Sequence, residues 1–458
     1  MIVLPLKKIL YWCDRCNLPL IGKRCACGND GRAVPLLKPY DVRPAMAHDL
    51  ELLYQLLSGR FGIAPIPGVV LLNKTGGLDR TDLVIAHGKR MGWLTFDPVE
   101  RVYRFDLEPD FLPHIAALAT RGVLDLEETA EAPELLRRGR MGGKRFRVRT
   151  KEPDGVLILR FKKQWGTGVL RGEFVRVREM APLNEEGARP DPDWEEVVER
   201  NKYHLKNLER NAIREIRRYM KTRPLANVSF SGGKDSLTAL TLARRAGVGE
   251  AFFIDTGLEL PETLEMAHRE GVEIIPKSVD FWKMVEREGA PSKERRWCST
   301  ELKLKPLRRY LEGKGPVITI QGNRWYESWN RSSLGAISEN PLVPMQLNMS
   351  PIRNWRALEV FLYLRWRRID WNPLYNRGIE RVGCYICPSM LESEYEELRR
   401  LHPELTERWD EFIRVTARET GYTEEYLRWG LWRWKSLPAK MKRLCESHGV
   451  CIPVRSDK

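Results

Sequence analysis

With 458 residues, the chain is long enough for about three domains and at least one large hydrophobic core. A hydrophobic content of 42% excludes a chain that is disordered throughout, and no apolar run reaches membrane-spanning length. The formal net charge of +15 favours a polyanionic partner such as a nucleic acid. Its 30% of charged residues would also suit the ion-pair networks of a thermophile-like surface, but such networks are nearly neutral.

The N-terminus shows neither a long apolar segment nor a small-residue cleavage site, so we expect a cytoplasmic protein. Thiols stay reduced in that compartment, and clustered cysteines there favour metal ligation over disulfides. The nine cysteines of the chain are therefore candidate metal ligands.

Residues 1–40 contain the pairs Cys13-x-x-Cys16 and Cys25-x-Cys27. Four thiolates at this spacing suit a tetrahedral zinc ion, and so small a module needs the metal in order to fold. We expect a zinc ribbon, with rubredoxin-like iron and an accidental cluster as alternatives. Its basic residues are typical of ribbons that lie on nucleic acid, although a zinc staple without a contact role is the alternative: Lys7, Lys8, Arg15, Lys23, Arg24 and Arg32.

Residues 41–125 alternate apolar runs with turns and are expected to form an α+β domain. Helical patterns cover Asp49–Leu57 and Phe111–Arg121, the second with Asp110 as its N-cap. Three segments have strand patterns: Val69–Asn73, Leu83–His87 and Val102–Leu107.

Residues 126–182 are expected to form a compact β module, with strand patterns at Phe146–Thr150, Val156–Phe161 and Phe174–Arg178 separated by glycines. The segment GVLRGEFVRVREMAP resembles the end of a PUA domain, a small RNA-binding barrel. The resemblance implies that the residues before it correspond to the domain that often precedes PUA in archaeal RNA-modifying proteins. A generic β-barrel adaptor is the alternative.

Residues 183–222 form a linker and a long helix in the expected organisation. Asn184–Pro192 is polar and bounded by proline, and Asp193 is a plausible N-cap for a helix that runs to about Tyr219. One face of this helix carries apolar residues at helical spacing. The other face is basic, and it is either solvated or turned toward RNA: Arg200, Lys202, Lys206, Arg210, Arg214, Arg217 and Lys221.

Residues 223–390 are expected to form an α/β domain with a doubly wound parallel sheet. Apolar strand patterns alternate there with helices, at 226–230, 251–254, 272–275 and 316–320. The ligand of such a sheet binds at the carboxyl ends of its strands, where a glycine loop and Asp255 both fall.

The glycine loop, NVSFSGGKDS at 227–236, has the composition of an anion cradle. Two adjacent glycines allow a sharp turn that aims backbone N–H groups at one anion. The helix that begins near Asp235 adds its positive end. A phosphate, pyrophosphate or sulfate is the expected ligand, and a serine-capped turn is the plain structural alternative. The expected donors are Ser231, Gly232, Gly233, Lys234 and Ser236.

This loop is not a Walker P-loop, because G-x-x-x-x-G-K-[ST] is absent, and it resembles the PP-loop of the ATP pyrophosphatase, or adenine nucleotide alpha hydrolase-like, superfamily. Further blocks resemble, in order, those of the phosphoadenosine phosphosulfate reductase family, which in the broad sense includes adenylyl sulfate reductases and nucleic-acid sulfur-modifying enzymes. They are FFIDTGLELPET (252–263), ERRWCSTELKLKPL (294–307), ITIQGNRWYESWNRS (318–332), PIRNWRALEVFLYL (351–364) and WNPLYNRGIERVGCYICP (371–388).

The resemblance implies that the loop holds the pyrophosphate of ATP, with Mg²⁺, while the α-phosphate is attacked and a substrate is adenylated. In the sulfonucleotide reductase branch it holds an anionic end of the nucleotide instead. The implied catalytic residues are Lys234, Asp235 and two arginine anion clamps, Arg324 and Arg331. The implied nucleotide contacts after the second strand are Asp255, Thr256 and Gly257.

A second group of cysteines lies inside this domain: Cys298, Cys384 and Cys387. The C-x-x-C follows a glycine and precedes Pro388, a usual setting for a thiolate-ligated cluster. Three thiolates could hold a [4Fe–4S] cluster with one iron open to bind sulfide, or Cys445 or Cys451 could complete it. Zinc and redox-active free thiols are the alternatives.

Two departures from the family separate the possible functions. Iron–sulfur adenylyl sulfate reductases carry Cys-Cys where this chain has Cys298-Ser299. Reductases also end in Glu-Cys-Gly-x-His, whose cysteine attacks sulfur, whereas this chain has Leu-Cys-Glu-Ser-His around Cys445. We therefore expect an ATP-dependent sulfurtransferase, and the resemblance to a PUA domain implies RNA as its substrate, with tRNA as the favoured class. A reductase that releases sulfite and a non-catalytic RNA-binding protein are the alternatives.

The tail, residues 391–458, has helical patterns in which tryptophans alternate with arginine or lysine. Such interleaving can stack on bases, but packing against the preceding domain is the favoured interpretation. The tryptophans concerned are Trp409, Trp429, Trp432 and Trp434.

Overall fold

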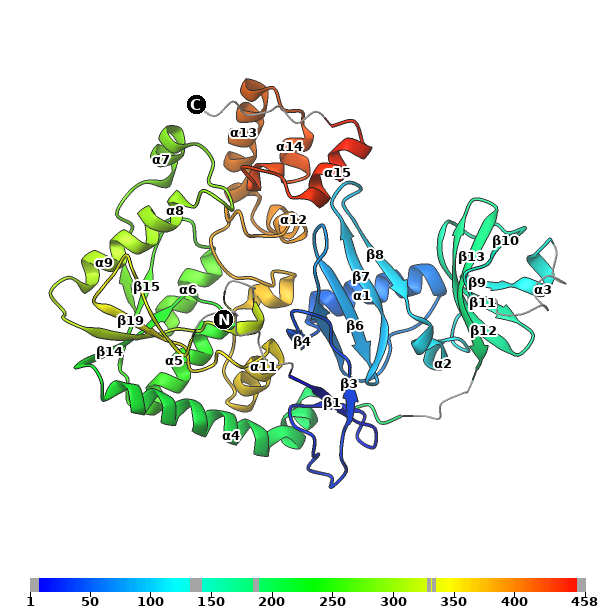
Figure 1. Cartoon of the computed structure of the whole chain (residues 1–458), viewed down its shortest axis with the longest axis horizontal. Coiled ribbons are helices and arrows are strands. Elements are labelled where there is room, and N and C mark those ends of the chain that lie inside the picture. The colour runs from blue at the N-terminus through cyan, green and yellow to red at the C-terminus, as the bar shows by residue number, and fades with distance from the viewer. Residues whose placement is uncertain (1–7, 132–141, 184–188, 328–330, 332–334, 451–458) are drawn as a thin grey trace.

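The computed structural model describes residues 8–131, 142–183, 189–327, 331 and 335–450, and within them it contains four sheets (Figure 1). Cys451 lies outside the described residues. Among the helices of the described part, none is both long and apolar enough to cross a membrane.

The first sheet is a small antiparallel ribbon with the strand order β2-β1-β3, formed by β1 (Leu10–Cys13), β2 (Leu18–Leu20) and β3 (Arg32–Val34). Its apolar residues join the same hydrophobic core as the long helix α4 (Trp194–Met220). The buried Asn201 of α4 fixes the contact, since it accepts from the Ile21 N–H at 2.8 Å and donates to the Pro19 carbonyl at 2.9 Å. The ribbon thus shares a hydrophobic core with the long helix.

The second sheet is antiparallel and meandering, and together with α1 (Ala47–Phe61) we call it the β4–β8 unit. Its order follows the chain: β4 (Val42–Pro44), β5 (Val70–Lys74), β6 (Thr81–Ala86), β7 (Lys89–Asp97) and β8 (Val102–Leu107). The three predicted strands and the first predicted helix are confirmed here.

The helix predicted over Phe111–Arg121 is wrong. Only η1 (Pro109–Phe111) and α2 (Leu112–Ile115) form, and Asp110 lies inside η1 rather than at a cap. The chain then turns back, because the N–H groups of Thr120 and Arg121 donate to the Phe61 carbonyl at the end of α1. These tertiary hydrogen bonds replace the helical ones that local propensity favours.

The third sheet has the order β10-β13-β12-β11-β9, with β9 parallel to β11 and the other pairs antiparallel. Its elements are β9 (Val123–Asp125), α3 (Leu126–Thr129), β10 (Arg145–Arg147), β11 (Gly155–Phe161), β12 (Gln164–Arg171) and β13 (Phe174–Pro182). The three strands expected in this region are present. The resemblance to a PUA domain remains a prediction.

Two strands that the sequence did not predict contain glycines at close backbone approaches. A Cβ on Gly166 of β12 would lie 1.8 Å from the Glu179 carbonyl oxygen, and one on Gly92 of β7 would lie 2.4 Å from the Phe105 ring. In a sequence alone, a glycine in a strand pattern suggests a break between strands, because the neighbouring group that requires the glycine is not visible. The glycines here allow neighbouring strands to approach.

The fourth sheet is the α/β core, with the order β16-β15-β14-β17-β19-β18 and only β18 antiparallel to its neighbour. Its strands are β14 (Leu225–Phe230), β15 (Glu250–Ile254), β16 (Glu273–Ile275), β17 (Val317–Ile320), β18 (Ile337–Glu339) and β19 (Gln346–Met349). The expected α/β fold with a parallel sheet is confirmed.

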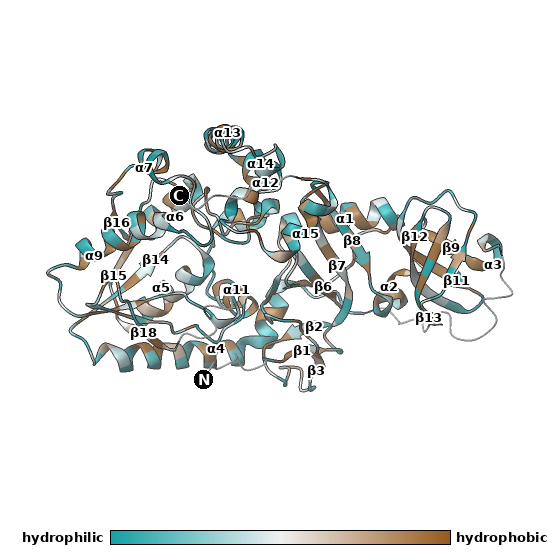
Figure 2. Cartoon of the chain, turned by 45° about the horizontal axis from the view of Figure 1, so that its top comes forward, coloured by the Kyte–Doolittle hydropathy of each residue, from teal (hydrophilic) through white to brown (hydrophobic). Residues whose placement is uncertain are grey.

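Helices cover both faces of this sheet. Val228 and Phe253 face the core shared with α4, whereas Phe252 and Val317 face a second cluster that includes Leu311 of α9. The helices are α5 (Lys234–Ala246), α6 (Pro261–Arg269), α7 (Phe281–Glu288), α9 (Lys305–Leu311) and α11 (Ala357–Trp366). Asp193 caps α4 by accepting from the Glu196 N–H, as predicted, and polar and apolar turns alternate along α4 in Figure 2.

The tail is helical, with α12 (Glu392–Leu401), α13 (Pro403–Thr420), α14 (Glu425–Arg428) and α15 (Ala439–Ser447). Trp409, Trp429 and Trp432 are buried in a core with Phe281 of α7, which confirms packing rather than base stacking. Trp434 is partly buried and carries the Lys293 ammonium 3.9 Å above its ring.

Candidate functional site

The glycine loop lies where β14 ends and α5 begins. Gly232 has φ of +74°, and a Cβ there would meet the Thr263 Cγ2 at 2.5 Å, so only glycine fits. The Ser236 hydroxyl accepts from the Ser231 N–H at 3.1 Å and donates to the Gly233 carbonyl at 2.9 Å. These bonds close the loop over the first turn of α5, as an anion cradle requires.

Residues from the WNPLYNRG segment support the loop from behind. The Tyr375 hydroxyl accepts from the Lys234 N–H at 3.0 Å. The Asn372 amide donates to the Gly232 carbonyl at 3.4 Å and to the Thr263 hydroxyl at 3.2 Å. Because Tyr375 and Asn372 fix both sides of the turn, the loop geometry is set by a segment far along the chain.

Lys234, Asp235 and Arg324 form one buried ion-pair chain. The Lys234 ammonium lies 2.8 Å from one Asp235 oxygen, and the Arg324 Nε donates to the other at 2.7 Å. Burial alone would raise the pKa of Asp235, but Arg324 and Lys234 together hold it below its ordinary value. Burial would lower the pKa of Lys234, and Asp235 reverses this. The carboxylate and the ammonium therefore stay charged.

Arg324 reaches this position because glycine precedes it. A Cβ on Gly322 would lie 2.4 Å from the backbone of Asp235, so the strand end can touch the helix start only with glycine there. The Arg324 side chain is 1% exposed, and its remaining donors bind Asp41 and the Trp355 carbonyl. The structure thus brings the predicted arginine to Asp235 and surrounds it with protein groups.

The second predicted arginine, Arg331, forms an ion pair with Glu327. Glu327 also acts electrostatically on Lys234 and Arg324 and raises the pKa of both. Glu327 was not predicted from the sequence, although it is part of the same R-x-x-E block as Arg324.

The loop after β15 connects the cradle to the cysteines. Asp255 ends the strand beside β14, and its carboxylate accepts from the Gly257 N–H at 2.8 Å. Thr256 donates to Glu259 at 2.7 Å and lies 3.6 Å from the Cys384 sulfur. The loop of residues 255–259 therefore lies against the glycine loop's strand at one end and against the C-x-x-C at the other.

Cys298, Cys384 and Cys387 share one environment. Burial, followed by the charges of the other two thiols, raises the pKa of Cys298 to about 11. Cys384 raises the pKa of Lys303, an exposed residue of a π-helical segment at 300–304. Such segments occur often at functional sites. Lys303 and Glu259 are residues of this site that the sequence did not predict.

The three thiols do not form a set of ligand atoms mutually within 4.8 Å among the described residues. One tetrahedral zinc would hold its sulfurs about 3.8 Å apart, given Zn–S bonds of about 2.3 Å. A cluster of four irons is larger than one ion and separates its cysteines more widely. Among the described residues these three thiols are therefore not gathered as the ligands of one tetrahedral ion would be.

Cys445 lies in a different environment from Cys298, Cys384 and Cys387. It is buried in α15 within the tail core, and burial raises the pKa of its thiol, with Glu446 and Glu425 as its charged neighbours. Its role as a fourth ligand remains a prediction.

The N-terminal cysteines form a compact candidate metal centre. The sulfur atoms of Cys13, Cys16, Cys25 and Cys27 all lie within 4.8 Å of one another, and those of Cys13 and Cys27 are 3.6 Å apart. These spacings fit a tetrahedral four-thiolate site.

Comparison with known proteins places the chain among its relatives. Residues 225–390 match the phosphoadenosine phosphosulfate reductase domain. The chain is 31% identical over 474 residues to the uncharacterized protein MJ0066 of Methanocaldococcus jannaschii, covering 93% of this chain and 96% of that protein. It is 28% identical over 180 residues to the adenosine 5'-phosphosulfate reductase of Allochromatium vinosum, covering 36% of this chain and 69% of that enzyme.

Among solved structures, the chain is similar to a phosphoadenylyl-sulfate reductase from Candida auris in complex with phosphate, with a TM-score of 0.33 and 18% identity. That similarity covers 40% of this chain and 95% of the reductase. The reductase domain, the near full-length relative and the order of motifs agree: the chain belongs to the phosphoadenosine phosphosulfate reductase family.

Proposed function

We propose that the protein is an ATP-dependent sulfurtransferase that adenylates RNA, with tRNA as its substrate. One observation carries the proposal: the loop 255–259 joins an anion cradle to a group of cysteines, on one of which Lys303 acts electrostatically. A nucleotide held at Lys234 would thus lie next to thiols that can handle sulfur. The departure from the reductases' Cys-Cys and Glu-Cys-Gly-x-His patterns supports the same choice.

The proposed reaction needs no change of oxidation state. A carbonyl oxygen of a base attacks the α-phosphorus of ATP, the bond to the β-phosphate oxygen breaks, and pyrophosphate leaves. Hydrosulfide then attacks the activated carbon, AMP leaves, and a proton passes to solvent. Carbon–oxygen becomes carbon–sulfur with sulfur entering as sulfide, so neither oxidant nor reductant is consumed.

The chain's own groups act on the first step. Backbone N–H groups of the loop and the Lys234 ammonium stabilise the charge that develops on the leaving pyrophosphate. Asp235, which is ionised, and Asp255 at the end of β15 are suited to Mg²⁺, which prefers carboxylate oxygens. Arg324 holds Asp235 in place, and Arg331 is paired with Glu327 of the same loop.

The second group of cysteines would hold the sulfur-handling cofactor. Cys298, Cys384 and Cys387 would ligate a [4Fe–4S] cluster, which when bound supplies an iron site for hydrosulfide. Lys303 beside Cys384 offsets the negative charge of the thiolates. At the other end of the chain, the ribbon's four cysteines would hold zinc and keep that sheet folded on α4.

A basic hollow on α4 supports an RNA partner. Its volume is about 800 Å³, and its lining combines four basic residues of α4, the lysine that follows the helix, one basic residue from the end of α5 and a single acidic residue. It lies near the amino end of β14, about 20 Å along the strand from the loop. A folded tRNA is long enough to reach both. The lining includes Arg210, Arg214, Arg217, Arg218, Lys221, Arg245 and Glu209.

A sulfonucleotide reductase that releases sulfite is the second candidate, favoured by the named activity of the Allochromatium relative. Its nucleophilic cysteine would be Cys445, which is 0% exposed in the tail core. That burial disfavours direct attack on a substrate in this conformation.

The test is pyrophosphate release by anaerobically purified protein given ATP and Mg²⁺, with and without bulk tRNA. We expect tRNA to stimulate release, and Lys234→Ala to lower it about 100-fold, since one preorganised donor is worth that much. Lys283→Ala, an exposed lysine on α7, is the matched control and should keep wild-type release. Sulfite formation from adenylyl sulfate without pyrophosphate release would replace the proposal with the reductase.

A further inference from the structure

Strand β4 comes from a separate sheet, yet its residues contact both halves of the site. Asp41 immediately precedes the strand and Arg43 lies within it. Side chains two residues apart in an extended chain point to the same side. Here that side faces the α/β core, where Asp41 meets Arg324 and Arg43 meets Glu380.

The Asp41 carboxylate completes the ion-pair chain of the glycine loop. One oxygen accepts from Arg324 at 2.8 Å and from the Ala357 N–H at 2.7 Å, and the other accepts from Arg324 at 3.0 Å. Arg324 in turn holds Asp235. Two carboxylates thus share one buried guanidinium, which fixes its planar fork between them.

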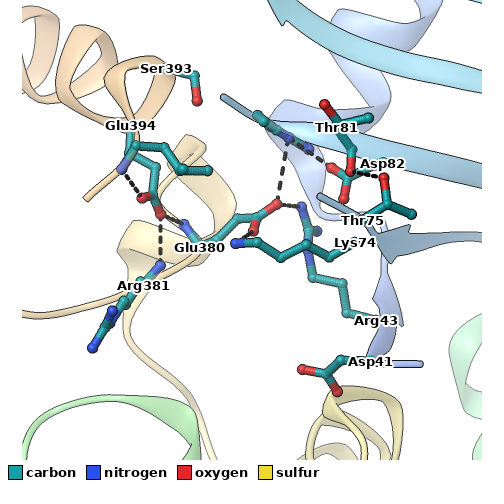
Figure 3. A network of polar contacts seen from close by, with 12 residues as sticks. Asp41, Arg43, Lys74, Thr75, Thr81, Asp82, Glu380, Arg381, Ser393 and Glu394 are labelled. Atoms are coloured by element: carbon teal, nitrogen blue, oxygen red, sulfur yellow. Dashed lines mark hydrogen bonds and ion pairs between the residues drawn. The ribbon is translucent and has the colours of Figure 1, made fainter. Parts of the chain in front are cut away.

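Arg43 acts on the segment that leads to the cysteines. It lies 2.6 Å from one Glu380 oxygen, and Lys74 lies 3.1 Å from the other (Figure 3). The N–H groups of Glu380 and Arg381 both donate to Glu394 at 2.9 Å, from the opposite side of the segment. The backbone three residues before Gly383-Cys384 is therefore held from two directions, one of them the β4–β8 unit.

We infer that Asp41 and Arg43 are positioning residues of the active site: the β4–β8 unit sets the place of Asp235 through Arg324, and the place of the Cys384 loop through Glu380. The inference rests on the proposed nucleotide site, and it does not depend on which substrate is adenylated there. The isolated α/β domain, without β4, would lack both contacts.

Asp41→Asn isolates the first contact, because asparagine keeps the shape and removes the charge. Arg324 would then have one carboxylate partner instead of two and would hold Asp235 less firmly. Removing an outer partner of a metal-binding group typically weakens binding 10- to 100-fold, and we expect about a tenfold loss of Mg²⁺-nucleotide affinity.

Asp79→Asn is the matched control. Asp79 belongs to the same unit and also contacts the rest of the protein, accepting from the N–H groups of Glu392 and Ser393 at 2.7 and 3.1 Å. Its loss should weaken packing at α12 without changing nucleotide affinity. Thermal unfolding of both variants shows whether they are folded to the same extent.

The experiment measures the affinity of the full-length wild type, Asp41→Asn and Asp79→Asn for Mg²⁺-ATP and for adenylyl sulfate by calorimetry. The wild type's choice of ligand tests the proposed function. The ratio between the two variants, for whichever ligand binds, tests the inference. A tenfold loss confined to Asp41→Asn is expected. Equal affinities, or tighter binding by Asp41→Asn because Arg324 has been released to the ligand, would overturn the inference, as would a wild type that binds neither.

The second contact is tested on protein without a cluster, by the rate at which iodoacetamide modifies Cys384. Glu380→Gln should raise that rate severalfold because the loop loses its anchor, whereas Lys283→Ala, at an exposed position of α7, should leave it at the wild-type value. An unchanged rate in a folded Glu380→Gln protein would remove Arg43 from the inference. If Glu380→Gln keeps the wild-type melting temperature, a raised modification rate reflects the freed loop and not general unfolding.

Discussion

The two groups of cysteines in this chain use the same residue type for different geometries. The ribbon cysteines come from one short segment, and their four sulfurs gather within 4.8 Å. Cys298, Cys384 and Cys387 come from two distant segments and, among the described residues, are not gathered within that distance; they lie beside Lys303 and a carboxylate-bearing loop. A compact local set closes around one ion, whereas a dispersed set next to a nucleotide loop leaves room for a larger group and a reactant.

The electrostatic surroundings of the two groups are more alike than their spacing. In the ribbon, burial raises the pKa of Cys25 to about 11, and the charges of Cys16 and Cys25 act on Arg200 of α4. In the second group Cys384 acts in the same way on Lys303, which is exposed. The two groups therefore differ in how their thiols are spaced rather than in whether a cation is near.

The largest expected effect is that of Cys16→Ser. Binding of a structural zinc is worth on the order of 10 kcal/mol, so losing one of four ligands should release the metal and unfold the ribbon. Because the ribbon shares its core with α4, the melting temperature of the whole protein should fall. Elemental analysis and calorimetry measure both effects. Cys298→Ser should keep the zinc, and a Cys16→Ser protein with full zinc content would contradict the assignment.

The next effect separates chemistry from folding. Cys384→Ser should keep the zinc, the fold and tRNA-stimulated pyrophosphate release, but lose sulfur insertion entirely, because adenylation uses the loop and sulfur transfer uses the thiols. Cys445→Ser should keep pyrophosphate release, and it should also keep sulfur insertion if the cluster has the three proposed ligands, Cys298, Cys384 and Cys387. Loss of all activity in Cys445→Ser, with Cys384→Ser still active, would reverse the roles of the two cysteines and favour the reductase.

A smaller effect is expected from charge reversals that test which region of the protein binds RNA. Arg214→Glu combined with Arg218→Glu in the α4 hollow should weaken tRNA binding severalfold at moderate salt and reduce its salt dependence, since each lost phosphate contact lowers the slope by about 0.9. The same double reversal at the exposed ribbon residues Arg15 and Arg24 is the comparison. A larger loss from the ribbon pair would make the ribbon, rather than α4, the main RNA surface.

The sequence predicts well those features that are encoded locally. The glycine loop, its strand and α5 are contiguous, and α4 has an N-cap and a long apolar stripe, so their patterns are visible without tertiary information. β7 and β12 were missed because their glycines are explained only by a neighbouring strand. The helix predicted at Phe111–Arg121 failed for a similar reason, since hydrogen bonds to Phe61 end it early.

The site follows the same rule. The ribbon's cysteines lie close in sequence and were grouped correctly in space. Asp41 contacts Arg324 and Tyr375 contacts the glycine loop, both from remote segments, and nothing in their local sequence marks them as partners of Arg324 and Lys234. Their identification needed the structure, because a long-range ion pair leaves no periodic pattern in one sequence.

The central claim is that ATP activation and sulfur transfer occur at adjoining parts of one site. Its most direct test is to incubate the anaerobic protein with ATP, Mg²⁺, hydrosulfide and bulk tRNA, digest the RNA, and search the nucleosides by mass spectrometry. A nucleoside with sulfur in place of oxygen, formed only with ATP and absent with Lys234→Ala or Cys384→Ser, is the predicted result. Unmodified RNA, together with sulfite release from adenylyl sulfate by the same preparation, would contradict the claim.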